Sequence, residues 1–437
     1  MKRHLRFGII GLALCLSSCI TSKKQVKDTT IATIIQSTLD TSTLFRRAHV
    51  GIIVTEATDT LYAHQAEKYF IPASTTKLFT FYAGLLSLPE NLPGAYYQVK
   101  EDTLFFWGTG EPTALHPDFG NDRVYQWLRQ QPHRVLVYSD AHFKQAGMGA
   151  GWAWDDFDAD YSAETSALPL YGNVVWTRME SGQLTIQPKI FRSSFVDEPT
   201  GKWIRRTWED NQFFIPTSVY QSQQFQQEIP FRTSGALTQQ FLMDTLQRWV
   251  SYRPIPLPSV YETFSTQPAD TVYRRMLWVS DNFLAEQLLL MCGPAWGTMG
   301  STQGVIDTLL AGPLASLPDR PRWVDGSGLS RYNLQTPRNL LYLLGKLQDT
   351  LPIDSLFHYL PSTHRPGTLG TMRGSEPPYI FAKSGSMSGV YNLAGFLRTK
   401  TGRLLRFAIL TNQFTQPVSA MRREVSLLLQ KLYEAES

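Results

Sequence analysis

The sequence has very little cysteine, with three residues among 437. Two of them, Cys15 and Cys19, lie near the start of the chain, and only Cys292 occurs in its body. A disulfide framework and a zinc site built from cysteines are therefore both excluded. Cys292 stands in the apolar run LLLMCG, which indicates a buried position where cysteine acts as a small hydrophobic side chain.

The sequence also has no large excess of positive or negative residues. The chain has 41 Lys and Arg against 37 Asp and Glu, a formal net charge of +4. Lys2, Arg3 and Arg6 lie in a basic N-terminal stretch, so the rest of the chain carries about +1 (+4 minus 3). This balance argues against a nucleic-acid partner, which needs a clustered basic face. Hydrophobic residues make up 43% of the chain, enough for a large core and more than one domain.

Two catalytic signatures are absent as well. The sequence contains no His-Glu-x-x-His motif, and His358 and His364 lack the spacing of ligands on one helix face, so we expect no metal. It also lacks the Gly-x-Ser-x-Gly motif of hydrolases with a Ser-His-Asp triad. Nothing in the sequence implies a cofactor.

The apolar run at the N-terminus is short. Phe7 to Leu16 is ten residues long and follows the basic stretch MKRHLR. It is too short for a membrane-spanning helix but suits a secretory signal peptide. The following Leu-Ser-Ser-Cys, which ends at Cys19, resembles the lipobox of bacterial lipoproteins. The resemblance implies a signal peptide at 1–18, a diacylated Cys19 and a lipid-anchored tether at 19–32. The alternative is an ordinary signal peptide with an incidental cysteine.

A diacylated cysteine would decide where the protein resides. Two acyl chains bind a bilayer stably, whereas a single chain binds only marginally. The sequence therefore predicts a lipoprotein of the bacterial cell envelope that faces the periplasm and contacts the membrane through its lipid. Ile20 stands where an aspartate often retains lipoproteins at the inner membrane, which favours the outer membrane.

The hydrophobic pattern predicts an α/β protein. Two β-rich runs around Ala57-Thr58-Asp59 indicate a hairpin, and a helical pattern extends from Pro72 to about Leu88. Helical patterns also cover 236–252 and 271–291. Near the C-terminus, YIFAKSG, VYNLAGFLR and LRFAILTNQ indicate three strands, followed by an amphipathic helix.

The middle of the chain has a different character. Residues 91–234 are rich in aromatics and turns, and we interpret them as an inserted, mostly β domain. Residues 33–90 are too few to bury a core alone, so we expect them to fold together with 235–437 around this insert.

Three short motifs carry the candidate chemistry. They are Ser74-Thr75-Thr76-Lys77, Ser280-Asp281-Asn282 and Lys383-Ser384-Gly385. A Ser-x-x-Lys alone should occur by chance about once in a chain of this length. Ser280-Asp281-Asn282 alone could be a helix N-cap, and Lys383-Ser384-Gly385 alone could be a strand end before a turn. The three motifs in this order, on fitting secondary structure, are far less expected by chance.

The spacing of the first motif has a chemical reason. Positions i and i+3 of a helix share a face, so the Ser74 hydroxyl and the Lys77 amine can meet. Serine is a poor nucleophile until a base takes its proton, and lysine can be that base when burial and nearby positive charge lower its pKa. We expect Lys383 to supply that charge and to hold a substrate carboxylate. Asn282 can orient Lys77, and Ser280 can pass a proton to the leaving amine.

These motifs match the set found in penicillin-recognising serine enzymes. The longer blocks PASTTKL, SDNFLAEQLLL, DGSGLSRYNLQTPRNL and AKSGSMSGVYNLAGFL resemble the D-alanyl-D-alanine carboxypeptidase/endopeptidase family, the class C penicillin-binding proteins. So do GWAWDDFDADYSAETSALPLYGN and, more loosely, FWGTGEP. The long segment between the first two motifs also fits this family and distinguishes the chain from β-lactamases.

The resemblance implies a β-lactamase/transpeptidase-like core and an enzyme that cleaves peptidoglycan stem peptides through a serine acyl-enzyme, with β-lactams as covalent inhibitors. Ser74 would be the nucleophile and Lys77 its base. The remaining motif residues would be Ser280, Asn282, Lys383, Ser384 and Gly385. The backbone N–H groups of Ser74 and Ser386 would form the oxyanion hole. Ser384 replaces the usual threonine, and Glu111 stands where the family usually has aspartate.

A further role comes from the block Trp152-Ala153-Trp154-Asp155-Asp156. In the resembling family, an aspartate of this block pairs with the free amine on the third residue of the peptide. Asp155 or Asp156 is the candidate here. A solvated acidic turn or a helix cap is the alternative, and the two tryptophans would more often pack than stack on a ligand. The loop Asp325-Gly326-Ser327-Gly328 is compatible with a structural or a functional role.

Two rival functions stay open. One is a β-lactamase or esterase on the same core, which the insert disfavours. The other is an inactive wall-binding lipoprotein, which the intact motifs disfavour. The sequence leaves open whether carboxypeptidase or endopeptidase activity dominates, and also the oligomeric state.

Overall fold

The structure is a computed structural model that describes residues 29–435 except 121, 144–146, 364–366, 373 and 375–376. The predicted signal peptide at 1–18 and Cys19 lie outside the described residues. So does the predicted tether, apart from its last four positions. Those four are not a tether, because helix α1 (Thr29–Thr41) already begins there and buries Ile31 and Ile35 in the core. No helix in the described part of the chain has both the length and the apolar character needed to cross a membrane.

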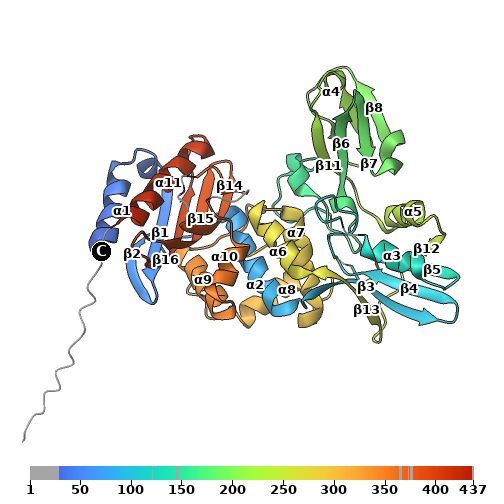
Figure 1. Ribbon diagram of the computed structural model, residues 1–437, viewed down its shortest axis with the longest axis horizontal. Helices are drawn as coiled ribbons and strands as arrows, with labels where there is room; N and C mark the ends of the chain where they lie inside the picture. The colour runs from blue at the N-terminus through green and yellow to red at the C-terminus, as the bar shows by residue number, and fades with distance from the viewer. Residues whose placement is uncertain are drawn as a thin grey trace, which may run out of the picture.

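The chain forms an α/β core and a second lobe that protrudes from it (Figure 1). The core contains one five-stranded antiparallel sheet. In spatial order its strands are β14 (Ile380–Met387), β15 (Val390–Arg398), β16 (Leu404–Asn412), β1 (His49–Glu56) and β2 (Asp59–His64). The predicted hairpin and the three predicted C-terminal strands are confirmed. Because β1 pairs with β16 along its whole length, the two ends of the chain share one sheet.

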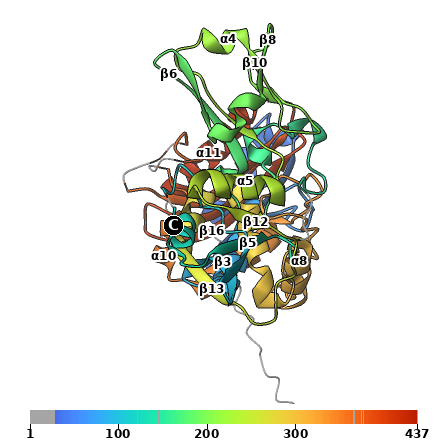
Figure 2. The same cartoon turned by 90° about the vertical axis from the view of Figure 1, so that its right-hand side faces the viewer.

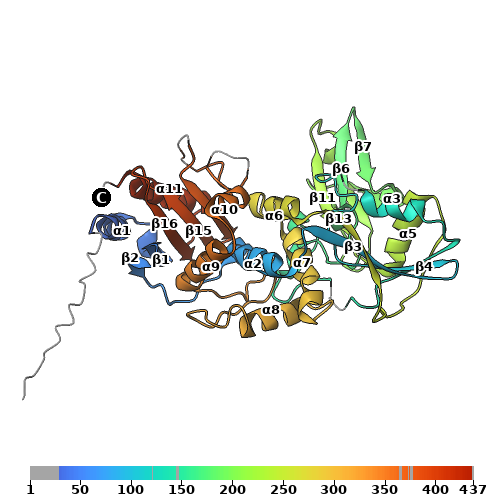
Figure 3. The ribbon, with the colours of Figure 1, turned by 60° about the horizontal axis from the view of Figure 1, so that its bottom comes forward.

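Helices cover both faces of this sheet (Figure 1). One face packs against α1 and α11 (Val418–Glu434), with Ile52, Leu393 and Leu429 in their shared core. The other face packs against a helical group. Its members are α2 (Lys77–Ser87), α6 (Ala269–Trp278), α7 (Asn282–Met291), α8 (Thr302–Ala311), α9 (Pro337–Thr350) and α10 (Ile353–Tyr359). Helices α2 and α7 pack against each other and lie between the sheet and the second lobe (Figure 3).

The prediction of a single helix over 271–291 is wrong. The structure has two helices there, α6 and α7, and the chain breaks between them at residues 279–281. Ser280 has φ +66°, which no α-helix can accommodate, and the Asp281 carboxylate accepts a hydrogen bond from the Leu284 N–H at 2.9 Å to cap α7. The break turns Ser280 away from the helix axis and leaves Asn282 in the first turn of α7.

The second lobe contains three sheets. A five-stranded sheet has the order β12 (Val250–Tyr252), β5 (Val135–Ser139), β4 (Thr103–Gly108), β3 (Asn91–Lys100) and β13 (Glu262–Pro268). The helices α3 (Arg123–Gln130) and α5 (Gly235–Leu246) share its core cluster. Two three-stranded sheets rise above it (Figure 2). They are β8 (Phe195–Glu198), β10 (Phe213–Pro216) and β9 (Arg205–Arg206), and β11 (Gln226–Pro230), β6 (Val174–Glu180) and β7 (Gln183–Gln187).

The boundary predicted at residue 234 does not match this lobe. Strand β13 pairs with β3, β12 pairs with β5, and Phe241 and Leu242 of α5 lie in the core of the insert. The inserted lobe therefore extends from Asn91 to Pro268. Helix α5 also ends earlier than predicted, because Gln247 adopts a left-handed conformation (φ +52°) and the chain then enters β12.

Candidate active site

Ser74 lies on a tight turn that leads into α2. Residues Ala73–Thr76 form a 3₁₀ turn, and Ala73 has φ +46°, a strained conformation for a residue with a side chain. The Thr75 hydroxyl donates to the Pro72 carbonyl at 2.7 Å and fixes the turn. The Ser74 hydroxyl is thereby half-buried at the N-terminal end of a helix, where developing negative charge is favoured.

Lys77 is completely buried, and its amine reaches three oxygens. The Lys77 Nζ lies 3.0 Å from the Ser74 Oγ, 2.6 Å from the Asn282 Oδ1 and 2.9 Å from the Ser327 carbonyl oxygen. Burial lowers the pKa of Lys77 to about 8, although Asp281, Glu286 and Asp325 oppose the shift. The first two motifs are therefore joined at one nitrogen, as the sequence predicts.

The loop at 325–328 completes the surroundings of Lys77. The buried Glu286 accepts hydrogen bonds from the Gly326 N–H at 3.0 Å and the Ser327 N–H at 2.8 Å. These bonds aim the Ser327 carbonyl at Lys77. Asp325 accepts from the Gly328 N–H at 2.8 Å and so closes the loop. The sequence left the role of this loop open, and the structure places it against the amine.

Glu286 itself was missed by sequence reasoning. Burial and the charge of Asp325 raise the pKa of Glu286 to about 7, while hydrogen bonds from Ser327 and Gly326 act in the opposite direction. The only available signal was an acidic residue within the apolar helix SDNFLAEQLLL. Such a side chain is rarely buried without a dedicated partner.

The middle and third motifs meet through Ser280. The Lys383 Nζ donates to the Ser280 Oγ at 2.9 Å and to the Ser384 carbonyl oxygen at 2.7 Å. The Asn282 side chain uses its other end to donate to the Tyr161 carbonyl oxygen at 3.0 Å. Asn282 thus links Lys77 to the inserted lobe.

One expectation for Lys383 needs correction. Its side chain is fully buried and does not line the cleft, so it is not placed to touch a substrate carboxylate directly. Burial and the positive charge of Lys77 hold the pKa of Lys383 well below its usual range. Burial is the largest cause of the lowered pKa of Lys77.

Strand β14 passes directly beside the nucleophile turn. A Cβ built on Gly385 would lie 2.6 Å from the Pro72 oxygen, 2.8 Å from the Ser74 nitrogen and 2.8 Å from the Thr75 nitrogen. Only glycine permits this approach. Ser384 and Ser386, on either side of Gly385, both line the cleft.

Gly385→Ala is therefore expected to push β14 away from the turn and to slow acylation by a penicillin by about 10²–10³-fold, the cost of losing one oxyanion donor. The rate of acylation by a fluorescent penicillin measures this loss. Gly345→Ala, on α9, is the control, because its Cβ would meet only the movable end of the Arg406 side chain. Equal acylation rates in both variants would contradict the role of this close approach.

The cleft in front of Ser74 has a volume of about 460 Å³. Its walls include Ser280, Asn282, Ser384 and Ser386. The insert contributes Ala153, Asp156 and Tyr161, and the segment after Gly328 contributes Arg331.

Only one of the two candidate aspartates lines the cleft. The half-buried Asp156 lines the cleft, whereas the exposed Asp155 faces a different hollow. Partial burial and a hydrogen bond with Asp156 raise the pKa of Tyr161 to about 12, so its phenol stays protonated and donates to this carboxylate. Sequence reasoning missed both Tyr161 and Arg331.

Two remaining sequence features lie away from the cleft walls. Glu111 is buried, and burial raises its pKa to about 7, while its Oε1 accepts a hydrogen bond from the Thr113 N–H at 3.2 Å. Trp152 donates through Nε1 to the Asp325 carboxylate at 3.0 Å and so joins the insert to the loop behind Lys77. Within the described residues, no three His, Cys, Asp or Glu side chains are grouped so as to hold a metal ion.

A serine on a helical turn, a lysine hydrogen-bonded to it and a second lysine on the adjacent edge strand are the arrangement of penicillin-recognising serine enzymes. Comparison with known proteins specifies the class. The profile of the D-Ala-D-Ala carboxypeptidase 3 (S13) family matches residues 32–202 and 262–431. The chain belongs to this family, and it is a serine-type D-Ala-D-Ala carboxypeptidase.

Individual relatives agree with this assignment. The chain is 24% identical over 415 residues to D-alanyl-D-alanine carboxypeptidase DacB of Haemophilus influenzae, covering 80% of this chain and 82% of the relative. The crystal structure of penicillin binding protein 4 from Haemophilus influenzae superimposes with a TM-score of 0.73 at 19% identity, covering 92% of this chain and 99% of that one. A complex of that protein with a β-lactam gives a TM-score of 0.68 at 18% identity, covering 93% of this chain and 99% of that one. The predicted β-lactamase/transpeptidase-like α/β fold is confirmed.

Proposed function

We propose that Ser74 is the acylated nucleophile and that Lys77 is its general base. The observation that carries this proposal is the set of contacts at the Lys77 amine. A neutral amine has two N–H bonds and one lone pair. The Asn282 and Ser327 oxygens accept the two N–H bonds at 2.6 and 2.9 Å, which leaves the lone pair for the Ser74 hydroxyl at 3.0 Å. A pKa of about 8 keeps part of Lys77 in this neutral form near pH 7.

The reaction follows from these positions. Ser74 gives its proton to Lys77 and its oxygen bonds to the carbonyl carbon of the penultimate D-alanine. The backbone N–H groups of Ser74 and Ser386 receive the resulting oxyanion. The C–N bond to the terminal D-alanine then breaks, and the leaving amine takes the proton that Lys77 had accepted, with Ser280 as the relay, so that Lys77 is neutral again. In the second half-reaction water attacks the ester carbonyl and gives a proton to Lys77. Lys77 returns this proton to the Ser74 oxygen as the ester C–O bond breaks and the shortened peptide leaves.

The walls of the cleft fit a substrate with both an amine and a carboxylate. Arg331 is a permanent cation on the cleft wall, so we assign the substrate carboxylate to Arg331 instead of the buried Lys383. Asp156, held by Tyr161, is the group that can pair with a free amine on the third residue of the peptide.

Asp156→Asn is expected to lower kcat/KM about 10–100-fold for peptides with a free side-chain amine, because a charge-assisted hydrogen bond is lost. Peptides in which this amine is acetylated, and penicillin, should react within about twofold of the wild-type rate. Asp155→Asn is the matched control, since Asp155 lies outside the cleft. A uniform loss over all substrates would mean that Asp156 only supports the fold.

The function is tested by release of D-alanine from a peptide that ends in D-Ala-D-Ala. Cleavage of a D-alanyl cross-link between two stem peptides, measured beside it, decides which of the two activities dominates. A β-lactamase would instead turn over penicillin rapidly and leave the peptides intact. An inactive wall-binding protein would cleave neither peptide and form no covalent adduct with penicillin.

We also propose that the protein is a lipoprotein anchored through Cys19, with the outer membrane as its site. The support is Leu-Ser-Ser-Cys after a ten-residue apolar run. Cys19→Ala should leave the precursor uncleaved by the lipoprotein signal peptidase or should release a soluble form. Fractionation of cell envelopes, with Cys292→Ala as control, measures the distribution. Unchanged membrane association and processing of Cys19→Ala would contradict the anchor.

A further inference from the structure

The turn that carries Asp156 has a second face. Ala153 and Asp156 line the catalytic cleft, whereas Trp154, Asp155 and Phe157 line a separate hollow of about 330 Å³. The two cavities are thus separated by a single 3₁₀ turn, Trp154–Asp156. A ligand that extends out of the cleft past this turn would enter the second hollow.

The Trp154 indole is presented there to solvent. Trp154 is 75% exposed, although backbone hydrogen bonds close the turn that carries it. The Asp156 N–H donates to the Ala153 carbonyl at 3.1 Å, and the Ala159 N–H donates to the Asp156 carbonyl at 3.0 Å. A large aromatic side chain that is already exposed on a hydrogen-bonded turn loses little further conformational freedom when a ligand covers it.

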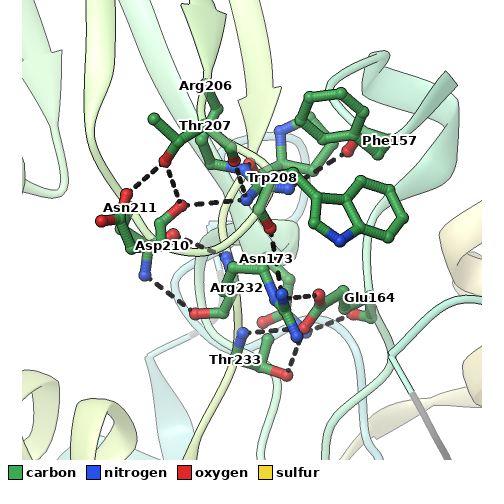
Figure 4. A network of polar contacts seen from close by, with 11 residues as sticks. Phe157, Glu164, Asn173, Arg206, Thr207, Trp208, Asp210, Asn211, Arg232 and Thr233 are labelled. Atoms are coloured by element: carbon green, nitrogen blue, oxygen red, sulfur yellow. Dashed lines mark hydrogen bonds and ion pairs between the residues drawn. The ribbon is translucent and has the colours of Figure 1, made fainter. Parts of the chain in front are cut away.

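Arg206 holds the residue that follows this turn, Phe157, through its backbone carbonyl and its ring (Figure 4). Its buried guanidinium donates to the carbonyl oxygens of Pro230 at 2.8 Å, Asp210 at 3.0 Å and Phe157 at 3.3 Å. It also lies 5.2 Å from the centre of the Phe157 ring, whose edge meets Trp208. The hollow is therefore a built feature of the insert, with its floor tied to β9 and β11.

Both signs of charge line this hollow. Asp155 and Asp158 lie beside Arg205 and Arg206. Arg205 also pairs with Glu198 at 3.2 Å, and the guanidinium of Arg206 already donates to backbone carbonyls. The groups open to a ligand are therefore the Trp154 indole and the two carboxylates, which accept hydrogen bonds from hydroxyl or amide groups.

A third hollow continues from the second. It has a volume of about 410 Å³ and shares Asp158 with its neighbour. Its walls include Trp203, which is 62% exposed, together with Asp160 and Glu228. Burial and nearby acidic residues raise the pKa of Glu228 to about 7, so this group can donate as well as accept hydrogen bonds near neutral pH. Each hollow thus combines one exposed indole with polar side chains at its edge.

We propose that these two hollows form a saccharide-binding groove that holds the glycan strand to which the substrate peptide is attached. The inference rests on the proposed function, because that function places the peptide in the cleft. A pyranose ring presents C–H bonds on its face and hydroxyl groups on its edge, which matches an exposed indole bordered by carboxylates in each of the two hollows. An extended tetrapeptide spans at most about 14 Å, so the sugar that bears it must bind close to the cleft.

The test compares a disaccharide-bearing muropeptide with the same peptide freed of its sugars. The wild-type protein should cleave the muropeptide with a kcat/KM about tenfold higher. Trp154→Ala should remove this preference and leave cleavage of the free peptide and acylation by penicillin unchanged. Trp249→Ala is the matched control, because Trp249 is 69% exposed on the same lobe but lines neither hollow.

Direct binding gives a second readout. An oligomer of N-acetylglucosamine should quench tryptophan fluorescence in the wild-type protein and in Trp249→Ala, and much less in Trp154→Ala. No preference for the muropeptide in the wild-type protein, or an equal preference in Trp154→Ala, would overturn the proposal. Competition by an oligolysine peptide but not by the oligosaccharide would also overturn it and assign the hollows to a cationic peptide. In each of these cases the acylation of Ser74 would stand untouched.

Discussion

Ser74→Ala is expected to reduce the release of D-alanine by at least about 10⁴-fold, because it removes the atom that forms the acyl-enzyme. The neighbouring groups stay in place in this variant. Lys77 keeps its contacts with Asn282 and Ser327, and the N–H groups assigned to the oxyanion hole are on the backbone. The loss should therefore appear in kcat with little change in thermal stability.

The measurement is D-alanine release from a peptide ending in D-Ala-D-Ala, with thermal unfolding recorded in parallel. Ser388→Ala is the matched control, since Ser388 also lines the cleft but makes no contact with Lys77 among the described hydrogen bonds. Its activity should stay within about twofold of wild type. If a folded Ser74→Ala protein kept wild-type activity, another nucleophile would have to carry the reaction.

Lys77→Ala is expected to slow acylation by about 10²–10⁴-fold, the usual cost of losing a general base. The buried amine also donates to Asn282 and Ser327, so the variant leaves two oxygens without their donor. Chemical rescue separates the two effects. Lys77→Cys treated with bromoethylamine regains an amine at nearly the same reach, and it should recover most of the acylation rate.

The pH dependence supplies a further check on Lys77. Its pKa in the folded protein is about 8, and the base is the neutral form. The acylation rate should therefore rise about tenfold per pH unit below pH 8 and level off above it. A rate that is flat between pH 6 and pH 8, or an aminoethylated variant as slow as Lys77→Ala, would contradict the role of Lys77 as base.

Local sequence patterns predicted the parts of the site that depend on short spacings. Ser74 and Lys77 meet because they are three residues apart on one turn, and Lys383 lies on the edge strand that its hydrophobic pattern predicts. The amphipathic patterns likewise gave the core sheet. The first two motifs come together through Asn282 and the last two through Ser280, as expected from their joint occurrence.

Contacts between distant segments could not be predicted in this way. The insert extends to Pro268 because β13 pairs with β3 across more than 160 positions, and nothing local in either strand encodes that pairing. The contact of the Ser280 hydroxyl with Lys383 joins segments 103 residues apart, and the aim of the Ser327 carbonyl depends on Glu286. Burial of Lys383, which removes it from the cleft wall, likewise follows from tertiary packing and not from its motif.

The sequence likewise could not decide which of Asp155 and Asp156 faces the cleft. Both belong to the same acidic pair, and only the direction of the 3₁₀ turn decides which carboxylate faces the cleft. The same turn places Trp154 on the outer face, although tryptophans in such blocks more often pack in a core.

The central claim is that Ser74 forms the acyl-enzyme, and peptide mapping of the penicillin-treated protein tests it most directly. Intact-protein mass spectrometry should show a single added penicillin, and digestion should place it on the peptide that contains Pro72-Ala73-Ser74-Thr75-Thr76-Lys77. An adduct on any other residue, or an unmodified protein after prolonged treatment above pH 8, would contradict the account.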